Sequence, residues 1–329
     1  MPSDPPSRMT VAPPGRSVLG LVESARNGDL RAVARLISLV EDESPALREV
    51  SARLAPHTGR AQVVGLTGAP GVGKSTSSSA LVGALRTAGK RVGVLAVDPS
   101  SPFTGGALLG DRVRMQDHAT DPEVFIRSMA TRGHLGGVAW ATAQALRVLD
   151  AAGYDVVLLE TVGVGQSEVD VAGLADTTVV LLAPGAGDGI QAAKAGILEV
   201  GDVFVVNKAD RDGADSVVRD LRGMVALADR APGGWRPPVL KTIAVKREGL
   251  DEVVAALDKH RAWMSANGEL RRRRTARARA EIEAIALSAL RASSVRGHAG
   301  LDDLAAAVVA GTTDPYTAAD SMLAGLGSA

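Results

Sequence analysis

GAPGVGKS, residues 68–75, is the stretch from which the fold of this chain can be read. It has the pattern GxxxxGK[ST] and stands between an apolar run, VVGLTG (63–68), and a helix-like segment, STSSSALVGALRTAG (75–89). In a phosphate-binding loop of this pattern, glycines let backbone N–H groups surround a β-phosphate. The lysine reaches the β and γ oxygens, and the serine hydroxyl binds Mg²⁺. We expect the following residues to contact a nucleotide: Gly68, Ala69, Pro70, Gly71, Val72, Gly73, Lys74, Ser75 and Thr76.

Short apolar runs alternate with helix-like segments through the middle of the chain. Near-continuous apolar strands of this kind are typical of a mostly parallel sheet that helices cover on both faces. Together with the phosphate loop, they predict an α/β fold of the P-loop NTPase type. The runs are VVGLTG (63–68), RVGVLAVD (91–98), EVFIRSM (123–129), YDVVLLE (154–160), TTVVLLA (177–183), DVFVVN (202–207) and PVLKTIA (238–244).

The chain divides into four predicted segments. Residues 1–15 are polar and rich in proline, so we expect them to be disordered. Residues 16–60 carry apolar positions at helical spacing and predict a helical extension. Residues 61–265 form the predicted α/β domain, and residues 266–329 return to a helical pattern.

The motif NKAD, residues 207–210, indicates which base the site binds. It directly follows a late apolar run, with Asn207, Lys208 and Asp210 as its fixed positions. A carboxylate can accept hydrogen bonds from both N1–H and the 2-amino group of guanine, and adenine offers no such pair of donors. The motif therefore predicts GTP and GDP as ligands.

The next strand is followed by the loop whose backbone touches the base in many GTPases. Thr242, Ile243 and Ala244 occupy that place. Many such loops read Ser-Ala-x, and this one departs from that pattern, so the backbone contact is an expectation from position alone.

Three carboxylates are candidate Mg²⁺ ligands beside Ser75. Asp98 ends the second strand and could hold the metal directly or through water, or form an Asp-Pro turn. Asp111 lies further along the same glycine-rich loop and could reach the metal or cap the next helix. Glu160 stands where an apolar strand meets a loop, a place from which a carboxylate often points at a metal and phosphate.

The stretch LLETVGVGQSEVD (158–170) suggests how hydrolysis would be arranged. The backbone N–H of Gly163 could contact a γ-phosphate. Many GTPases have Gln directly after this glycine, but here the residue is Val164. We therefore expect slow intrinsic hydrolysis, completed by Gln166, a rearranged loop or a partner. The predicted catalytic residues are Lys74, Glu160, Gly163 and Gln166.

Composition excludes several other classes of protein. Basic and acidic residues number 37 each, which argues against bulk attraction to nucleic acid or to membranes. The chain has no cysteine, so disulfides and thiolate metal sites are excluded. No apolar run approaches the ~18 residues of a membrane span. We expect a soluble cytoplasmic protein.

The run Arg271 to Arg274 has two interpretations. It could bind an anionic partner, but such a run is more often a solvated helix face, which we favour. The neighbouring apolar positions Ile282, Ile285 and Leu290 suggest one face buried against another subunit.

The motifs GAPGVGKST, VDPSS…GGALLGDR, RSMATRGHLGG, LLETVGVGQSE, GAGDGIQAAKAG and NKAD occur in this order. Together they resemble the MeaB/ArgK family, the methylmalonyl-CoA mutase-associated GTPases. The resemblance covers the chain from about residue 16 to its end. By position, Lys74, Asp98, Asp111 and Glu160 match the family's phosphate and magnesium residues. Asp188, Gln191 and Lys194 match a mobile loop that communicates with the mutase.

The resemblance also implies what the protein assembles with. It implies a homodimer, with residues 266–329 as a helical dimerisation arm; the balanced charge separately argues against a nucleic-acid or membrane partner. It implies a partnership with the adenosylcobalamin-dependent methylmalonyl-CoA mutase, and a cobalamin adenosyltransferase is a further candidate. In this family, GTP hydrolysis is coupled to cofactor loading and to protection or reactivation of the mutase.

Two other functions remain open at this level. A kinase would pass the γ-phosphate to a small molecule or to an amino-acid transport protein, an idea reflected in an older family name. It would need an acceptor pocket with a positioned base beside the γ-phosphate, and the sequence offers no candidate for one. A nickel or cobalt metallochaperone is disfavoured by the absence of cysteines and of a histidine-rich tract.

Overall fold

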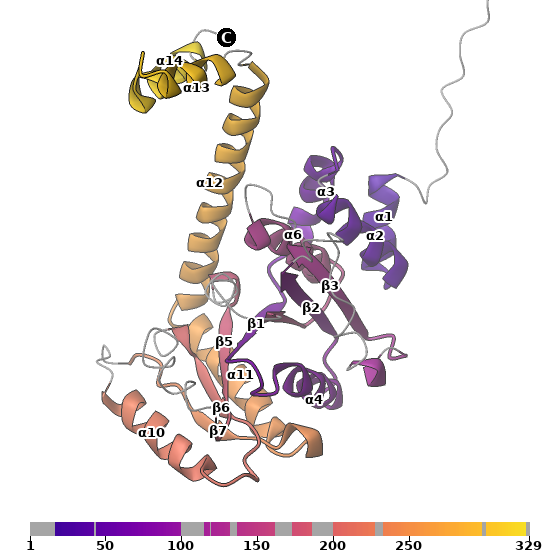
Figure 1. Ribbon diagram of the computed structural model, residues 1–329. Coiled ribbons are helices and arrows are strands. Elements are labelled where there is room, and N and C mark those ends of the chain that lie inside the picture. Colours follow the sequence, from indigo (N-terminus) through magenta and orange to yellow (C-terminus); the bar gives the residue numbers. More distant parts are fainter. Residues whose placement is uncertain are drawn as a thin grey trace, which may run out of the picture. The chain divides into compact units, whose positions relative to one another are not determined.

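The computed structural model (Figure 1) describes residues 17–42, 44–99, 115–118, 120–131, 137–161, 173–185, 200–227, 233–297 and 301–326. These residues fall into two compact units. The first runs to Arg274 and the second begins at Thr275. The predicted division at residues 60 and 265 stays a prediction, and the predicted disorder of residues 1–15 lies outside the described residues.

The first unit is built on a sheet of seven parallel strands in the order β3-β2-β4-β1-β5-β6-β7 within the described residues. This arrangement confirms the predicted α/β class. Val, Leu and Ile dominate the strands because each lies between two layers of helices and is covered on both faces. The strands are β1 (Gln62–Thr67), β2 (Val92–Pro99), β3 (Val124–Thr131), β4 (Val156–Thr161), β5 (Thr177–Leu182), β6 (Val203–Val206) and β7 (Val239–Lys241).

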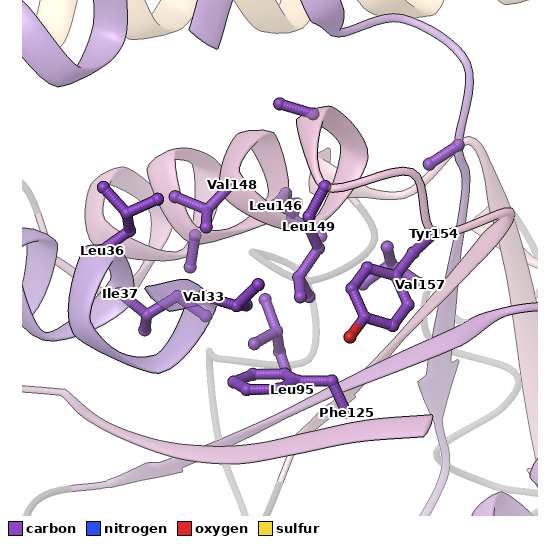
Figure 2. Packing of buried hydrophobic residues seen from close by; sticks show 14 of the residues in the cluster. Val33, Leu36, Ile37, Leu95, Phe125, Leu146, Val148, Leu149, Tyr154 and Val157 are labelled. Carbon is purple, nitrogen blue, oxygen red and sulfur yellow. The ribbon is translucent and has the colours of Figure 1, made fainter. Parts of the chain in front are cut away.

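One face of the sheet is covered by the N-terminal helices and the helix that follows β3. These are α1 (Val18–Arg26), α2 (Leu30–Glu41), α3 (Leu47–Leu54) and α6 (Gly137–Ala151). Figure 2 shows Leu36 and Ile37 from α2 packing near Leu149 of α6 and Phe125 of β3. The N-terminal helices therefore share one hydrophobic core with the sheet.

The opposite face is covered by α4 (Lys74–Thr87) and α11 (Leu250–Ala266), whose apolar side chains pack on Val64, Val94 and Leu158. Helix α10 (Ala214–Leu227) packs with strands β5 to β7 in a third cluster. Short 3₁₀ turns connect the layers: η1 (Ala55–His57), η2 (Gln116–His118) and η4 (Ala244–Lys246).

Helix α4 carries a polar group inside this core. Ser78 is 0% exposed, and its hydroxyl has no hydrogen-bond partner among the described residues. A buried polar group that makes no bond costs about 1–3 kcal/mol.

We expect Ser78→Ala to raise the free energy of unfolding by about 1 kcal/mol, since it removes this hydroxyl without leaving a large cavity. Urea unfolding measures the change. Ser79→Ala on the same helix is the control, because Ser79 is only half-buried and reports the helix propensity of alanine, about 0.5 kcal/mol. A Ser78→Ala protein less stable than the control would contradict the expectation.

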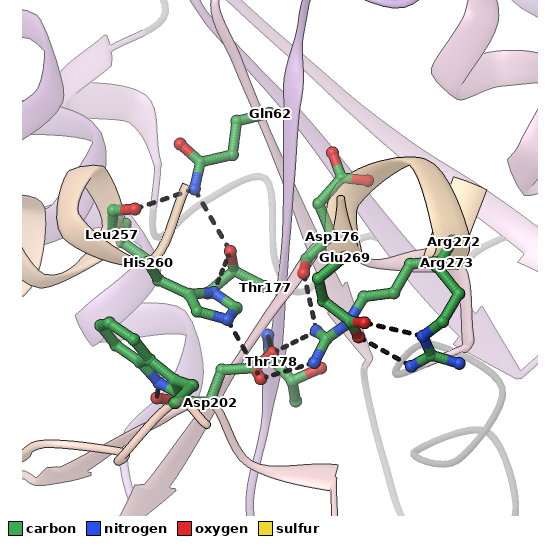
Figure 3. A network of polar contacts seen from close by, with 11 residues as sticks. Gln62, Asp176, Thr177, Thr178, Asp202, Leu257, His260, Glu269, Arg272 and Arg273 are labelled. Atoms are coloured by element: carbon green, nitrogen blue, oxygen red, sulfur yellow. Dashed lines mark hydrogen bonds and ion pairs between the residues drawn. The ribbon is translucent and has the colours of Figure 1, made fainter. Parts of the chain in front are cut away.

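The first turn of α12 (Glu269–Gly297) is held by ion pairs at the amino-terminal edge of the sheet. Arg273 donates to both carboxylate oxygens of Asp202, at 2.8 and 3.0 Å, and Arg274 donates to Asp176 at 2.6 and 3.1 Å. Asp176 and Asp202 directly precede β5 and β6 and are 0% and 5% exposed. Figure 3 shows the contacts of Arg273 with Asp202 and with the Asp176 carbonyl.

These contacts correct our interpretation of the arginine run as a solvated helix face. It was wrong for Arg273 and Arg274, which pair with buried carboxylates. Burial opposes the charge of Arg273, but the hydrogen bonds and charges of Asp202 and Glu269 outweigh it and raise its pKa. The hydrogen bond from Arg272, with help from Arg273, lowers the pKa of Glu269 to about 2.

His260 of α11 lies inside the same network and is 0% exposed. Its Nδ1 lies 2.9 Å from the Thr177 hydroxyl, and its Nε2 lies 3.4 Å from Asp202 Oδ1. Trp235 and Trp263 pack beside the ring and against each other, with centroids 4.7 and 5.8 Å from it. Burial lowers the pKa of His260 from its usual 6.5, although the Asp202 charge opposes the shift.

This pKa shift predicts a pH dependence of stability. The folded protein binds a proton at His260 less readily than the unfolded chain. The contribution of this residue is therefore fully present above pH ~6.5 and is lost as the pH falls below it. Urea unfolding between pH 7.5 and 5 should show the decline, and it should be shallower in His260→Asn. Parallel pH profiles of the two proteins would refute the assignment.

The second unit contains the rest of α12, together with α13 (Leu301–Val309) and α14 (Pro315–Leu326). Ile282 and Ile285 of α12 are 67% and 42% exposed, and Val309 and Tyr316 are exposed as well. The side chain of Leu290 lies outside the described residues. The predicted burial of this face against another subunit stays a prediction.

Candidate functional site

The loop between β1 and α4 needs glycine at two positions in particular. Gly68 has φ 150°, and a Cβ there would come within 2.3 Å of the Leu181 carbonyl oxygen on β5. Gly73 has φ 94°, and a Cβ there would come within 2.7 Å of Asn207 Nδ2. The turn therefore passes too close to its neighbours for any side chain, which is the backbone approach that a phosphate loop requires.

Lys74 begins α4 and turns back over the loop. Its Nζ donates to the Gly68 carbonyl at 2.5 Å. The ammonium is thus held above the loop's backbone, at the N-terminus of a 14-residue helix whose partial positive charge favours anions. This confirms the predicted strand–loop–helix geometry, with Lys74 at the mouth of the loop.

Ser75 and Glu160 meet at the carboxyl edge of the sheet. The Ser75 hydroxyl donates to Glu160 Oε1 at 2.7 Å, and the two residues are 8% and 1% exposed. Glu160 is the last residue but one of β4, in register with Leu66 of β1 and Ala96 of β2. A hydroxyl and a carboxylate brought together beside a phosphate loop are the hard oxygen donors that Mg²⁺ prefers, so the residues present fit the metal.

Asp98 lies at the same edge by register. It pairs with Ala130 of β3 and stands two residues beyond Ala96, the β2 partner of Glu160. Its side chain lies outside the described residues, so its role as a metal ligand stays a prediction. The same holds for Asp111, Gly163, Gln166, Asp188, Gln191 and Lys194, which lie outside the described residues altogether.

Asn207 joins the base motif to the phosphate loop. It directly follows β6, is 3% exposed, and donates from Nδ2 to the Val72 carbonyl at 2.9 Å. Its Oδ1 accepts from the Ala244 N–H at 3.1 Å and from the Thr242 hydroxyl at 3.3 Å. One buried side chain therefore holds the phosphate loop and the loop after β7 in fixed relation.

Lys208 makes a second connection. Its backbone is left-handed, with φ 56°, and its Nζ donates to the Gly71 carbonyl at 2.6 Å. Asp210 lies at the surface with 41% of its side chain exposed, and its Oδ2 is 3.7 Å from Lys246 Nζ. The carboxylate is thus accessible to a ligand, and Lys246 is a neighbour that the sequence reasoning missed.

The N–H groups of Thr242, Ile243 and Ala244 all donate hydrogen bonds to acceptors within the chain. We expected the backbone of these residues to contact the base. That contact stays a prediction, and these three N–H groups already have acceptors. The bonds run from Thr242 to the Val206 carbonyl (2.9 Å), from Ile243 to the Glu248 carbonyl (3.1 Å) and from Ala244 to Asn207 Oδ1 (3.1 Å).

Neither a cluster of metal-binding side chains nor a membrane-spanning helix is found in the part of the chain that the structure describes. Histidine, aspartate and glutamate do not gather there in groups of three or more that could hold a metal ion. None of the described helices is long and apolar enough to cross a membrane.

Comparisons with known proteins agree with this geometry. The profile of a family described as methylmalonyl Co-A mutase-associated GTPase MeaB matches residues 33–299. A protein of Pyrococcus abyssi named as a GTPase is 48% identical over 309 residues, which cover 92% of this chain and 95% of the relative. The methylmalonic aciduria type A homolog of Caenorhabditis elegans, named as mitochondrial, is 37% identical over 276 residues, covering 78% and 69%.

A solved structure shares the fold. The crystal structure of a LAO/AO transport system kinase superposes with a TM-score of 0.67 at 28% identity, and the match covers 93% of this chain and 96% of that one.

Proposed function

The chain belongs to the MeaB family of methylmalonyl-CoA mutase-associated GTPases. From that membership we propose that it couples GTP hydrolysis to the loading of adenosylcobalamin into a mutase that depends on this cofactor. The same cycle would protect or reactivate the mutase. The observation that carries the nucleotide part is the pair of bonds from Asn207 to Val72 and from Lys208 to Gly71. These bonds join the NKAD motif to the phosphate loop, which supports a single site for a guanine nucleotide.

Different described residues bind the phosphates, the metal ion and the base of the nucleotide. Lys74 exchanges its bond to the Gly68 carbonyl for the β and γ oxygens of the nucleotide. Ser75 and Glu160 would hold Mg²⁺, which would supply positive charge to neutralise those oxygens. Asp210 accepts from N1–H and the 2-amino group of guanine. Asn207 keeps the base and phosphate ends at a fixed separation.

Hydrolysis itself is proposed to depend on a partner. Val164 offers no polar group to orient the attacking water, so the free protein should turn over slowly. The mutase, or Gln166 repositioned by it, completes the site.

The exposed Ile282 and Ile285 of α12 support residues 266–329 as a dimerisation arm, since neighbouring exposed apolar side chains favour a covering subunit.

The test is whether a mutase changes the rate of phosphate release. Methylmalonyl-CoA mutase, with and without adenosylcobalamin, is added to the protein and GTP, and free phosphate is measured. We expect a stimulated rate, and GTP-dependent transfer of cofactor to the apo-mutase. An acyl-CoA enzyme that uses no cobalamin is the control and should leave the rate unchanged. Equal rates with all three additions would refute the coupling.

The kinase alternative is not favoured, because the matching family and the relative from Pyrococcus abyssi are described as GTPases. It makes a separate prediction: labelled γ-phosphate would appear on an added amino acid or transport protein rather than as free phosphate.

A further inference from the structure

One edge of guanine presents both hydrogen-bond donors and an acceptor to a protein. N1–H and the 2-amino group are donors, which the Asp210 carboxylate suits, whereas the 6-oxo group is an acceptor that needs a donor. Adenine carries an amino group at the same ring position, so a donor aimed at the 6-position contributes to discrimination between the bases.

The loop after β7 has few backbone donors left for this purpose. The N–H groups of Thr242, Ile243 and Ala244 are engaged within the chain, as described above. The N–H of Ala244 donates to Asn207 Oδ1, within the base motif itself, at 3.1 Å. The 6-oxo group therefore cannot rely on these three donors while the loop keeps this form.

Lys246 is placed to supply the donor. It ends η4, and its Nζ is 3.7 Å from Asp210 Oδ2, with 54% of its side chain exposed. The turn beneath it is closed by bonds from its own N–H to the Ile243 carbonyl (2.9 Å) and from Arg247, at φ 59°, to the Ala244 carbonyl (3.1 Å). The ammonium thus stands on a fixed turn beside the carboxylate that reads the base.

We propose that Lys246 is a specificity-determining residue whose ammonium donates to the 6-oxo group of guanine while Asp210 accepts from N1–H and the 2-amino group. The inference rests on the proposed binding of guanine nucleotides. In this arrangement the ammonium neutralises the repulsion between the Asp210 carboxylate and the 6-oxo oxygen beside it. The adenine amino group would instead face a cation and lose its partner.

The test compares nucleotides that differ at one ring position. Dissociation constants are measured for GDP and for 6-thio-GDP, whose sulfur accepts hydrogen bonds weakly. Lys246→Met should weaken GDP binding about tenfold, in keeping with a half-exposed bond to a charged donor, and should weaken 6-thio-GDP binding less. Lys246→Arg should restore most of the affinity for GDP.

Lys241→Met is the matched control, because Lys241 is a half-exposed lysine on the preceding strand that pairs with Asp215. It should bind GDP as the wild type does. Asp210→Asn tests the binding of guanine separately from the role of Lys246. This variant should bind xanthosine diphosphate more tightly than GDP.

Three results would overturn this proposal or the function on which it rests. If the wild type binds no guanine nucleotide, the proposed function fails. If Asp210→Asn switches preference but Lys246→Met binds GDP within twofold of wild type, a backbone donor serves the 6-oxo group and only the Lys246 assignment is overturned. Tighter GDP binding by Lys246→Met would also overturn it, because Lys246 would then compete with the base for Asp210.

Discussion

Glu160→Gln is expected to lower GTP hydrolysis by about 10²–10³-fold at saturating nucleotide. The amide keeps the shape of the side chain and can still accept from the Ser75 hydroxyl, which lies 2.7 Å from Oε1. It removes the negative charge that would attract Mg²⁺ to the carboxyl edge of the sheet in the proposed site. GDP binding in the absence of metal should change little, because Lys74 and the loop backbone are untouched.

Phosphate release across a Mg²⁺ titration measures this effect. Glu160→Asp is the companion variant, since it keeps the charge but shortens the reach by one methylene group, and it should retain more activity than Glu160→Gln. Thermal unfolding of each protein checks that the fold survives. If Glu160→Gln hydrolyses GTP at the wild-type rate and with the wild-type Mg²⁺ requirement, Glu160 is no part of the metal site.

Arg274→Met is expected to lower the free energy of unfolding by about 3–5 kcal/mol, the usual cost of removing one partner of a buried ion pair. Asp176 is 0% exposed and would keep its charge without the guanidinium. The carbonyls of Gly59 and Ala61, which accept from Arg274 at 2.6 and 2.7 Å, would lose their donors as well. Methionine preserves most of the side-chain volume, so the loss reports the polar contacts.

The neighbouring Arg272→Met provides the comparison. Arg272 pairs with Glu269 on the same helix, three residues away, and 71% of its side chain is exposed, so its removal should cost under about 1 kcal/mol. Both values come from urea unfolding at one pH. Equal costs for the two variants would contradict the description of Arg274 as a buried anchor.

The sequence predicted those parts of the fold that depend on local pattern. Strands such as TTVVLL (177–182) are apolar without alternation because both of their faces are buried, and this is visible without a structure. The phosphate loop is specified by Gly68, Gly73 and Lys74 through backbone geometry that few other residues allow.

Contacts between distant segments could not be read in this way. Arg274 and Asp176 lie 98 residues apart, and a run of four arginines looks solvated when its partners are unknown. The N–H of Ala244, a residue placed near the base by position alone, donates to Asn207, which is 37 residues away. Both contacts join segments that are distant in the sequence, and a local pattern does not reveal them.

The central claim is that the phosphate loop and the guanine motif form one site that hydrolyses GTP. The most direct measurement follows γ-labelled GTP and ATP, each with the protein and Mg²⁺, and quantifies every labelled product over time. We predict that GTP yields GDP and free phosphate in equal amounts, slowly for the protein alone, and that ATP is turned over far less. Preferred turnover of ATP, or label transferred to an acceptor in place of free phosphate, would contradict the account.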